Sequence, residues 1–258
     1  MLEIIIRISS VFSRKKECFL FPESFADLSM EQWTSYHQFL LQNIGEAELL
    51  WAFLTGSNTF KLKIPGNRIA AIENLLMFIY NEPLPDWYMK LIEVDGIKLI
   101  GPAGEFKNVV CGEFVFADTF YTTFRETENE IYLNKCLAVL MREPDSTANE
   151  LAADWKGDHR IVFNENHIDR RAALIAKLPF EMRMAALFNY SIIRELLEKR
   201  YIWIFQKTNV TENTRKTGWD RILRSMCYGD ITKLNDIFFI PLYTFFDELN
   251  DSIKGNAK

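Results

Sequence analysis

The segment from 180 to 207 constrains the fold more than any other feature. Its sequence predicts a helix, and apolar residues lie on nearly every face of that helix. A helix that is apolar on nearly every face lies either at the centre of a core or beneath a partner. Pro179 separates it from a shorter helical stretch at 165–178, since proline breaks a continuing helix. We therefore expect a largely helical protein arranged around this segment.

Outside this segment, the sequence predicts several further helices and a smaller number of β-strands. Asp95-Gly96 joins two short apolar runs, and this pair tolerates the positive φ angles that a two-residue hairpin turn requires. Residues 2–8 predict a strand, with a charged turn at 13–17 and a returning strand at 18–21. Ser29 and Gln32 have the spacing of a helix capping box. Helical spacing recurs at 30–44, 46–55, 69–79, 112–124, 130–142, 219–228, 231–238 and 241–253.

These elements predict an α+β fold that is mainly α-helical, with a small N-terminal β element and a central β-hairpin packed on helices. The polar stretch 143–158 contains helix breakers and is the candidate boundary within the chain. It separates an N-terminal α+β part, 1–143, from a helical C-terminal part, 159–258. One continuous domain is the alternative.

Composition excludes several classes of protein. The net charge of −5 argues against a dedicated nucleic-acid binder, whose surface is normally basic. The four cysteines form no C-x-x-C pair, so we expect reduced, buried thiols. No apolar stretch is long enough to span a membrane, and the N-terminus lacks the pattern of a signal peptide. We therefore expect a cytoplasmic protein.

The sequence contains no catalytic, cofactor-binding or metal-binding motif, and we expect no catalytic residue, cofactor or metal. Two alternatives remain open. Asp154, Asp158 and His159 lie in the polar loop, where they are candidates for a small carboxylate-dependent enzyme using 154–159. The segment 194–224 is rich in basic residues and is the candidate surface of a nucleic-acid-associated regulatory module: Arg194, Lys199, Arg200, Lys207, Arg215, Lys216, Arg221 and Arg224.

One short segment carries an unusual density of aromatic rings within a chain that is 14% aromatic. A single helical stripe is too narrow to hide all of the rings between 114 and 124. Aromatic residues left at a surface are enriched in protein interfaces. We therefore predict a partner-binding surface formed by Phe114, Phe116, Phe120, Tyr121 and Phe124.

Several patches of the sequence carry a resemblance to a known family. Residues 21–33, with Pro22, Leu28-Ser29, Gln32 and Trp33, look like the opening of certain phage tail-assembly proteins. Residues 112–121 are similar to a G-x-F-x-D-x-x-T-Y segment of the same proteins, with Asp118 shifted within it. The stretches 133–140, 218–226, 233–234 and 241–246 continue the pattern. The chain thus resembles tail assembly chaperones of tailed bacteriophages that infect Bacteroides-like hosts.

This resemblance implies a non-enzymatic bacteriophage or prophage assembly protein. Such chaperones bind the long, apolar, helical tape-measure protein and keep it soluble until tail-tube subunits assemble around it. The implied partner is therefore the tape-measure or tail-tube protein, and the implied location is the cytoplasm of the bacterial host, with the virion as the alternative. An aromatic groove that receives an apolar helix suits this role.

Overall fold

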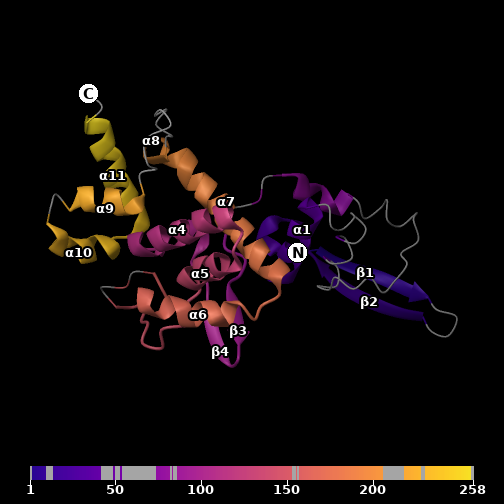
Figure 1. Cartoon of the computed structure of the whole chain (residues 1–258). Coiled ribbons are helices and arrows are strands. Elements are labelled where there is room, and N and C mark those ends of the chain that lie inside the picture. The colour runs from indigo at the N-terminus through magenta and orange to yellow at the C-terminus, as the bar shows by residue number, and fades with distance from the viewer. Residues whose placement is uncertain are drawn as a thin grey trace.

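The computed structural model describes residues 2–9, 14–41, 49, 53, 74–81, 83, 86–152, 155, 157–205, 218–227 and 230–256. Within these residues the chain is a mainly helical α+β protein, as the sequence predicts (Figure 1). The strands form two separate antiparallel hairpins, β1–β2 and β3–β4. The fold class is therefore confirmed.

The strands are β1 (Leu2–Ser9), β2 (Arg14–Phe21), β3 (Leu91–Val94) and β4 (Ile97–Ile100). The α-helices are α1 (Met30–Leu40), α4 (Cys111–Thr127), α5 (Glu130–Leu140), α6 (Ile168–Ile175), α7 (Phe180–Arg200), α8 (Ile202–Phe205), α9 (Trp219–Met226), α10 (Leu234–Phe238) and α11 (Leu242–Asn256). Short 3-10 helices lie at η1 (Phe25–Asp27), η2 (Asn74–Tyr80), η3 (Gly104–Phe106), η4 (Glu165–His167) and η5 (Ile231–Lys233).

Helix α7 lies between two hydrophobic clusters, which explains its apolar circumference. One face carries Ala186, Tyr190 and Ile193 into the larger cluster, which also includes residues of β3, β4, α4, α5, α6 and α11. The other face carries Ala185 into a smaller cluster that contains Trp33 of α1. The apolar helix is therefore covered by its own chain on both sides.

The N-terminal hairpin is longer than the sequence predicts. Strands β1 and β2 pair along their whole length, from Leu2 opposite Phe21 to Ser9 opposite Arg14. The charged residues at 14–17, expected in a turn, belong to β2, because a main-chain ladder continues regardless of side-chain polarity. In Figure 1 this hairpin extends away from the helices.

Local signals at the two best-marked positions are confirmed. Ser29 Oγ accepts from the Gln32 amide at 3.2 Å, and Gln32 Oε1 accepts from the Ser29 amide at 2.8 Å, which completes the capping box. Asp95 and Gly96 have φ angles of 53° and 74°, as a two-residue turn between β3 and β4 requires. The helix predicted at 46–55 falls largely outside the described residues.

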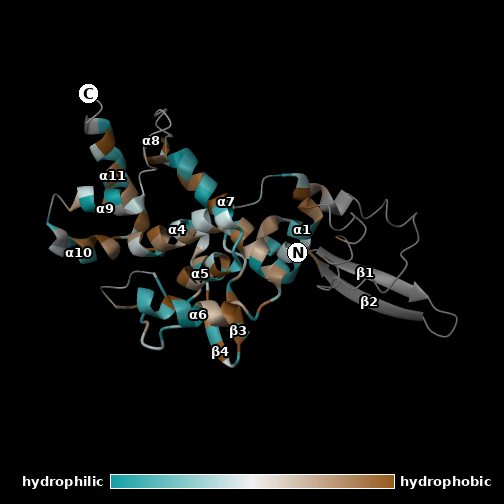
Figure 2. Cartoon of the chain, in the orientation of Figure 1, coloured by the Kyte–Doolittle hydropathy of each residue, from teal (hydrophilic) through white to brown (hydrophobic). Residues whose placement is uncertain are grey.

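The larger cluster takes residues from both sides of the polar stretch 143–158. Leu137 of α5 and Tyr190 of α7 are both fully buried members of it. Figure 2 shows brown, apolar ribbon concentrated where α4, α5, α7 and the β3–β4 hairpin meet. Cys111, Cys136 and Cys227 are free, buried thiols, as expected. The side chain of Cys18 lies outside the described set.

Candidate functional site

The aromatic segment of α4 is packed against other parts of the chain. Phe114 and Phe124 are buried, while Phe116, Phe120 and Tyr121 are half-buried. The ring of Phe114 meets Trp219 and Phe246 edge-on, at centroid distances of 5.4 and 5.1 Å. Phe114 and Phe124 therefore contribute to the core, whereas the other three rings retain some surface. Their binding of a partner stays a prediction.

One hollow lies where three irregular segments meet at the N-terminus of α4. Isolated β-bridges join Ile100 to Arg142, Pro144 to Arg160, and Val110 to Pro241. The third bridge is reinforced because the Cys111 amide donates to the Ile240 carbonyl oxygen at 2.9 Å. These main-chain bonds fix the ends of α4, α5 and α11 relative to one another.

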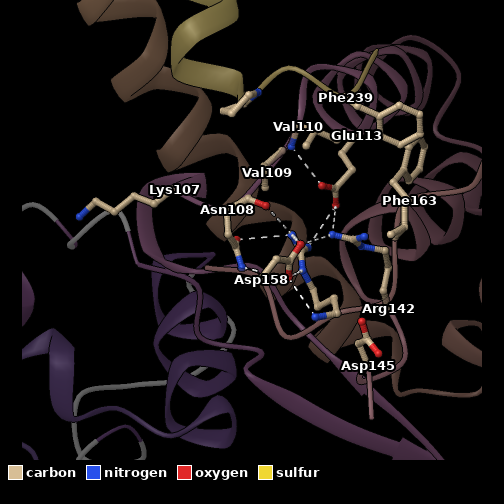
Figure 3. A pocket seen from close by; sticks show the side chains of 13 residues that line it. Lys107, Asn108, Val109, Val110, Glu113, Arg142, Asp145, Asp158, Phe163 and Phe239 are labelled. Atoms are coloured by element: carbon tan, nitrogen blue, oxygen red, sulfur yellow. Dashed lines mark hydrogen bonds and ion pairs between the residues drawn. The ribbon is translucent and has the colours of Figure 1, made fainter. Parts of the chain in front are cut away.

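Four charged side chains pair inside this junction, as Figure 3 shows. Arg142 and Arg160 are each 2% exposed and Glu113 is 0% exposed. Asp158 accepts from Arg142 Nη2 at 2.6 Å and from Arg160 Nε at 2.8 Å. Glu113 Oε1 lies 3.0 Å from Arg142 Nη2 and 3.2 Å from Arg160 Nη1. Two cations thus balance two carboxylates, as burial of charge requires.

Main-chain oxygens satisfy most of the remaining donors. Arg160 Nη1 donates to the Leu140 carbonyl at 2.8 Å, and Nη2 donates to the Asn108 carbonyl at 3.1 Å. Arg142 Nη1 donates to the Ile161 carbonyl oxygen. Arginine suits this position because its planar group offers five donors in a fixed geometry. Each guanidinium group therefore holds two chain segments together.

Two buried atoms of the cluster have no hydrogen-bond partner among the described residues. They are Arg142 Nε, a donor, and Glu113 Oε1, an acceptor whose contacts with the two guanidinium groups lack hydrogen-bond geometry. Glu113 Oε2, by contrast, accepts from the Val110 amide at 3.1 Å. Burial lowers the pKa of Arg142, and Arg160 adds to this effect, while Glu113 and Asp158 oppose it.

The cluster forms one wall of a hollow of about 520 Å³, which we call the arginine pocket. Val162, Phe163 and Phe239 form an apolar wall, and Lys107 and Asp145 also line the pocket. A second hollow of about 270 Å³ shares Phe163 and Phe239 with it. Its other lining residues are the apolar Phe116, Leu234 and Phe238 and the polar Glu165, Thr232 and Asn235. Because the two hollows share these two residues, we refer to them together as the Phe163/Phe239 groove.

The sequence predicts that Asp154, Asp158 and His159 act together in the 154–159 loop. The structure describes Asp158 and His159, and these two side chains have different partners. Asp158 faces the two arginines and lines the arginine pocket. His159 instead lies 3.2 Å from Glu150 and packs on the Trp155 ring at 4.9 Å, and it is not among the residues that line the pocket. Asp154 lies outside the described residues.

Several basic residues of the 194–224 segment are engaged within the chain. Arg194 pairs with Asp118 and Glu198, and Lys199 lies 2.9 Å from Glu195. The guanidinium group of Arg200 lies over the Tyr243 ring at 4.9 Å. Lys207, Arg215 and Lys216 fall outside the described residues.

The sequence does not predict the buried charge cluster of Glu113, Arg142, Asp158 and Arg160. Arg142 follows the apolar run at the end of α5, and Glu113 lies between Gly112 and four apolar residues in α4. A lone charge inside an apolar run is the available signal, because such a charge is buried only when it is paired. Nothing in the sequence shows that residues as distant as 113 and 160 meet.

Comparisons with known proteins give this site no precedent. No family model matches the chain, and neither a curated protein nor a solved structure matches it. Among the described residues, no group of acidic, histidine and cysteine side chains is arranged to hold a metal ion. None of the described helices combines the length and hydrophobicity needed to cross a membrane.

Proposed function

We propose that this chain is a non-enzymatic assembly protein of a tailed bacteriophage or prophage, acting as a tail assembly chaperone. Its partner is the tape-measure protein, and it acts in the host cytoplasm. The Phe163/Phe239 groove receives an apolar segment of that partner. The phage assignment is supported by the resemblance in the sequence, and the binding role is supported by the groove.

One observation supports the binding role. The groove exposes apolar side chains next to aromatic rings. Val162 is 70% exposed and Phe239 is 38% exposed, although both line the arginine pocket. Covering apolar surface of this kind stabilises a complex by roughly 25 cal/mol per Å². A groove that accommodates a few side chains gives moderate affinity, which suits a chaperone that must later release its partner.

Phe116 connects the groove to the aromatic segment singled out in the sequence. Its ring lies 5.7 Å from Phe163 and 6.3 Å from Phe238, and it lines the smaller hollow. Apolar helices bind grooves of this kind through side chains on one face. The tape-measure protein, as a long apolar helix, offers such a face.

The test is capture of partners from the native host during particle production, with the tagged full-length chain and mass spectrometry. We expect the wild-type chain to recover the tape-measure protein. The double variant Val162→Ser with Phe239→Ser should lose it. The matched control is Ile131→Ser with Leu151→Ser, because these side chains are 57% and 94% exposed and do not line the groove.

Two results would contradict the proposal. Recovery of no phage protein by a well-expressed wild-type chain would remove the assembly role. Equal recovery of the tape-measure protein by the groove variant and the wild type would place the binding surface elsewhere. Circular dichroism of both double variants checks that they remain folded.

A further inference from the structure

We propose that residues 230–238, which include α10, form an autoinhibitory strap. In the free chain this segment, which we call the α10 strap, covers part of the Phe163/Phe239 groove, and it must lift away when the partner helix binds. The inference rests on the proposed function for the identity of the partner. It adds how access to the groove is controlled.

The α10 strap presents one apolar face to the rest of the chain. Leu234, Ile237 and Phe238 have the i, i+3, i+4 spacing of a single helical face, and all three pack on the larger hydrophobic cluster. Asn235 and Asp236, on the other side, are exposed. Helix α10 packs against α4 (Figure 1). Apolar helices that bind grooves use the same spacing, so α10 offers α4 the kind of surface that the partner would offer.

The closest approach of the strap to α4 is described at Gly112. A Cβ atom at position 112 would lie 2.6 Å from Phe238 Cδ1 and 3.2 Å from the Phe238 carbonyl oxygen. The Phe238 ring also lies 6.3 Å from the Phe116 ring, and both rings line the smaller hollow. The strap therefore occupies surface of α4 that the groove would offer to a partner.

Side-chain packing alone holds the strap on α4 within the described part of the chain. The hydrogen bonds and the ion pair described for it join residues within 227–240. Main-chain bonds fix the residues that follow it, because the Cys111 amide donates to the Ile240 carbonyl oxygen and the Leu242 amide donates to the Val109 carbonyl oxygen, both at 2.9 Å. The strap can thus open while the chain after it stays in place.

The seam beneath the strap is incompletely packed, because the smaller hollow of about 270 Å³ lies along it. Apart from Phe239, the lining residues are divided between the strap and the rest of the chain: Thr232, Leu234, Asn235 and Phe238 on the strap, and Phe116, Phe163 and Glu165 outside it. Side chains that border an unfilled space lose dispersion attraction. The strap is therefore held less tightly than a fully packed helix.

A substitution at position 112 should open the strap. Gly112→Ala places a methyl group against Phe238 and should push the strap off α4. The fluorescent probe 1-anilinonaphthalene-8-sulfonate binds exposed apolar surface, and we expect its fluorescence to rise about threefold. Capture of the tape-measure protein should rise by about the same factor, because the open fraction sets the apparent affinity. Gly218→Ala is the matched control, since nothing lies within 4 Å of a Cβ atom there.

A pair of cysteines should close the strap reversibly. A Cβ atom at position 112 would lie 3.3 Å from Phe238 Cβ, near the range of about 3.5–4.5 Å found in disulfides. The double variant Gly112→Cys with Phe238→Cys is purified, oxidised or reduced, and applied to a lysate of the phage-producing host. We expect the oxidised form to capture about tenfold less tape-measure protein than the reduced form, and to give weaker probe fluorescence.

Two controls accompany the cysteine pair. Peptide mapping by mass spectrometry verifies that the bond joins positions 112 and 238, because the native Cys111 is adjacent. The wild-type chain, treated with the same oxidant and reductant, should capture equal amounts in both states. Near-UV circular dichroism checks that every variant keeps its tertiary packing.

The outcomes separate this inference from the proposed function. Equal capture of the tape-measure protein by the oxidised and reduced forms would overturn the control by the strap and leave the proposed function intact. Reduced capture by Gly112→Ala would also overturn it. Capture of no phage protein by any form would contradict the proposed function instead. Probe fluorescence that is the same in the oxidised and reduced forms would overturn the strap whatever the chain captures.

Discussion

The indole N–H of Trp33 donates a hydrogen bond of 2.9 Å to the carbonyl oxygen of Ala185. This bond joins α1 to the N-terminal third of α7, between residues 152 positions apart in the sequence. The Trp33 ring also stacks on Tyr88 at 4.2 Å and on Phe188 at 5.7 Å. Trp33 is therefore one of the side chains that attach the smaller hydrophobic cluster to α7.

Trp33→Phe removes the indole donor and part of the stacked ring. We expect the free energy of unfolding to fall by about 2 kcal/mol, from the lost hydrogen bond and the cavity together. Thermal unfolding followed by circular dichroism measures the change. Trp203→Phe, at a surface-exposed tryptophan, is the matched control and should change stability by less than about 0.5 kcal/mol. Equal effects of the two substitutions would contradict the role given to Trp33.

Gly101→Ala tests the packing beneath the β3–β4 hairpin. A Cβ atom at position 101 would lie 2.3 Å from the Trp87 ring and 2.7 Å from the Met89 carbonyl oxygen. Trp87 is fixed because its Nε1 donates to that same oxygen at 3.0 Å. We expect a loss of about 1–3 kcal/mol in chemical denaturation. Gly218→Ala, where nothing lies within 4 Å, should be close to neutral, and a neutral Gly101→Ala would refute this packing.

Asp118→Asn tests the attachment of α9 to the core. Asp118 accepts from the Tyr190 hydroxyl at 3.2 Å, from Trp219 Nε1 at 2.7 Å and from Arg194. Every partner is a donor, so the amide group of asparagine would face a donor and leave it unpaired. We expect a loss of about 2–4 kcal/mol.

The control for this substitution is Asp169→Asn, because Asp169 is 81% exposed and pairs with Lys135 at the surface. It should change the free energy of unfolding by less than about 1 kcal/mol. Both variants are compared by urea denaturation. A stable Asp118→Asn variant would show that α9 does not depend on this carboxylate.

We predict that the folded chain loses stability in mild acid because of the buried His37. Burial lowers the pKa of His37 below its ordinary value of 6.5, and its ring packs on Phe188 at 5.1 Å. The unfolded chain therefore binds the proton more readily than the folded chain. The contribution to stability is complete above pH 6.5 and decreases as the pH falls toward the lowered pKa.

Urea denaturation between pH 7.5 and pH 5.5 checks this prediction. His37→Gln should reduce the pH dependence in that range, and His159→Gln, at an exposed histidine, should retain it. A pH dependence that persists unchanged in the His37→Gln variant would assign it to other groups.

Local signals in the sequence predict the elements well, and they predict the site poorly. The capping box at Ser29, the turn at Asp95-Gly96 and the periodicity of α7 each arise from neighbouring residues, so the sequence contains them directly. The arginine pocket arises from residues that meet only through tertiary bridges. Arg160, for example, is buried because it reaches the Leu140 carbonyl and Glu113, and neither contact has a local pattern.

Helix α7 contributes residues to both hydrophobic clusters, and this has a consequence for synthesis of the chain. The smaller cluster needs Ala185, Phe188 and Ile192, although its other members end at Tyr88. A ribosome adds about 5–20 residues per second, so roughly 5–20 seconds separate translation of Tyr88 from that of Ile192. The N-terminal apolar residues remain without their final cover during that interval. A chain arrested shortly after Tyr88 should therefore recruit nascent-chain chaperones, and a chain arrested after α7 has emerged should recruit fewer of them.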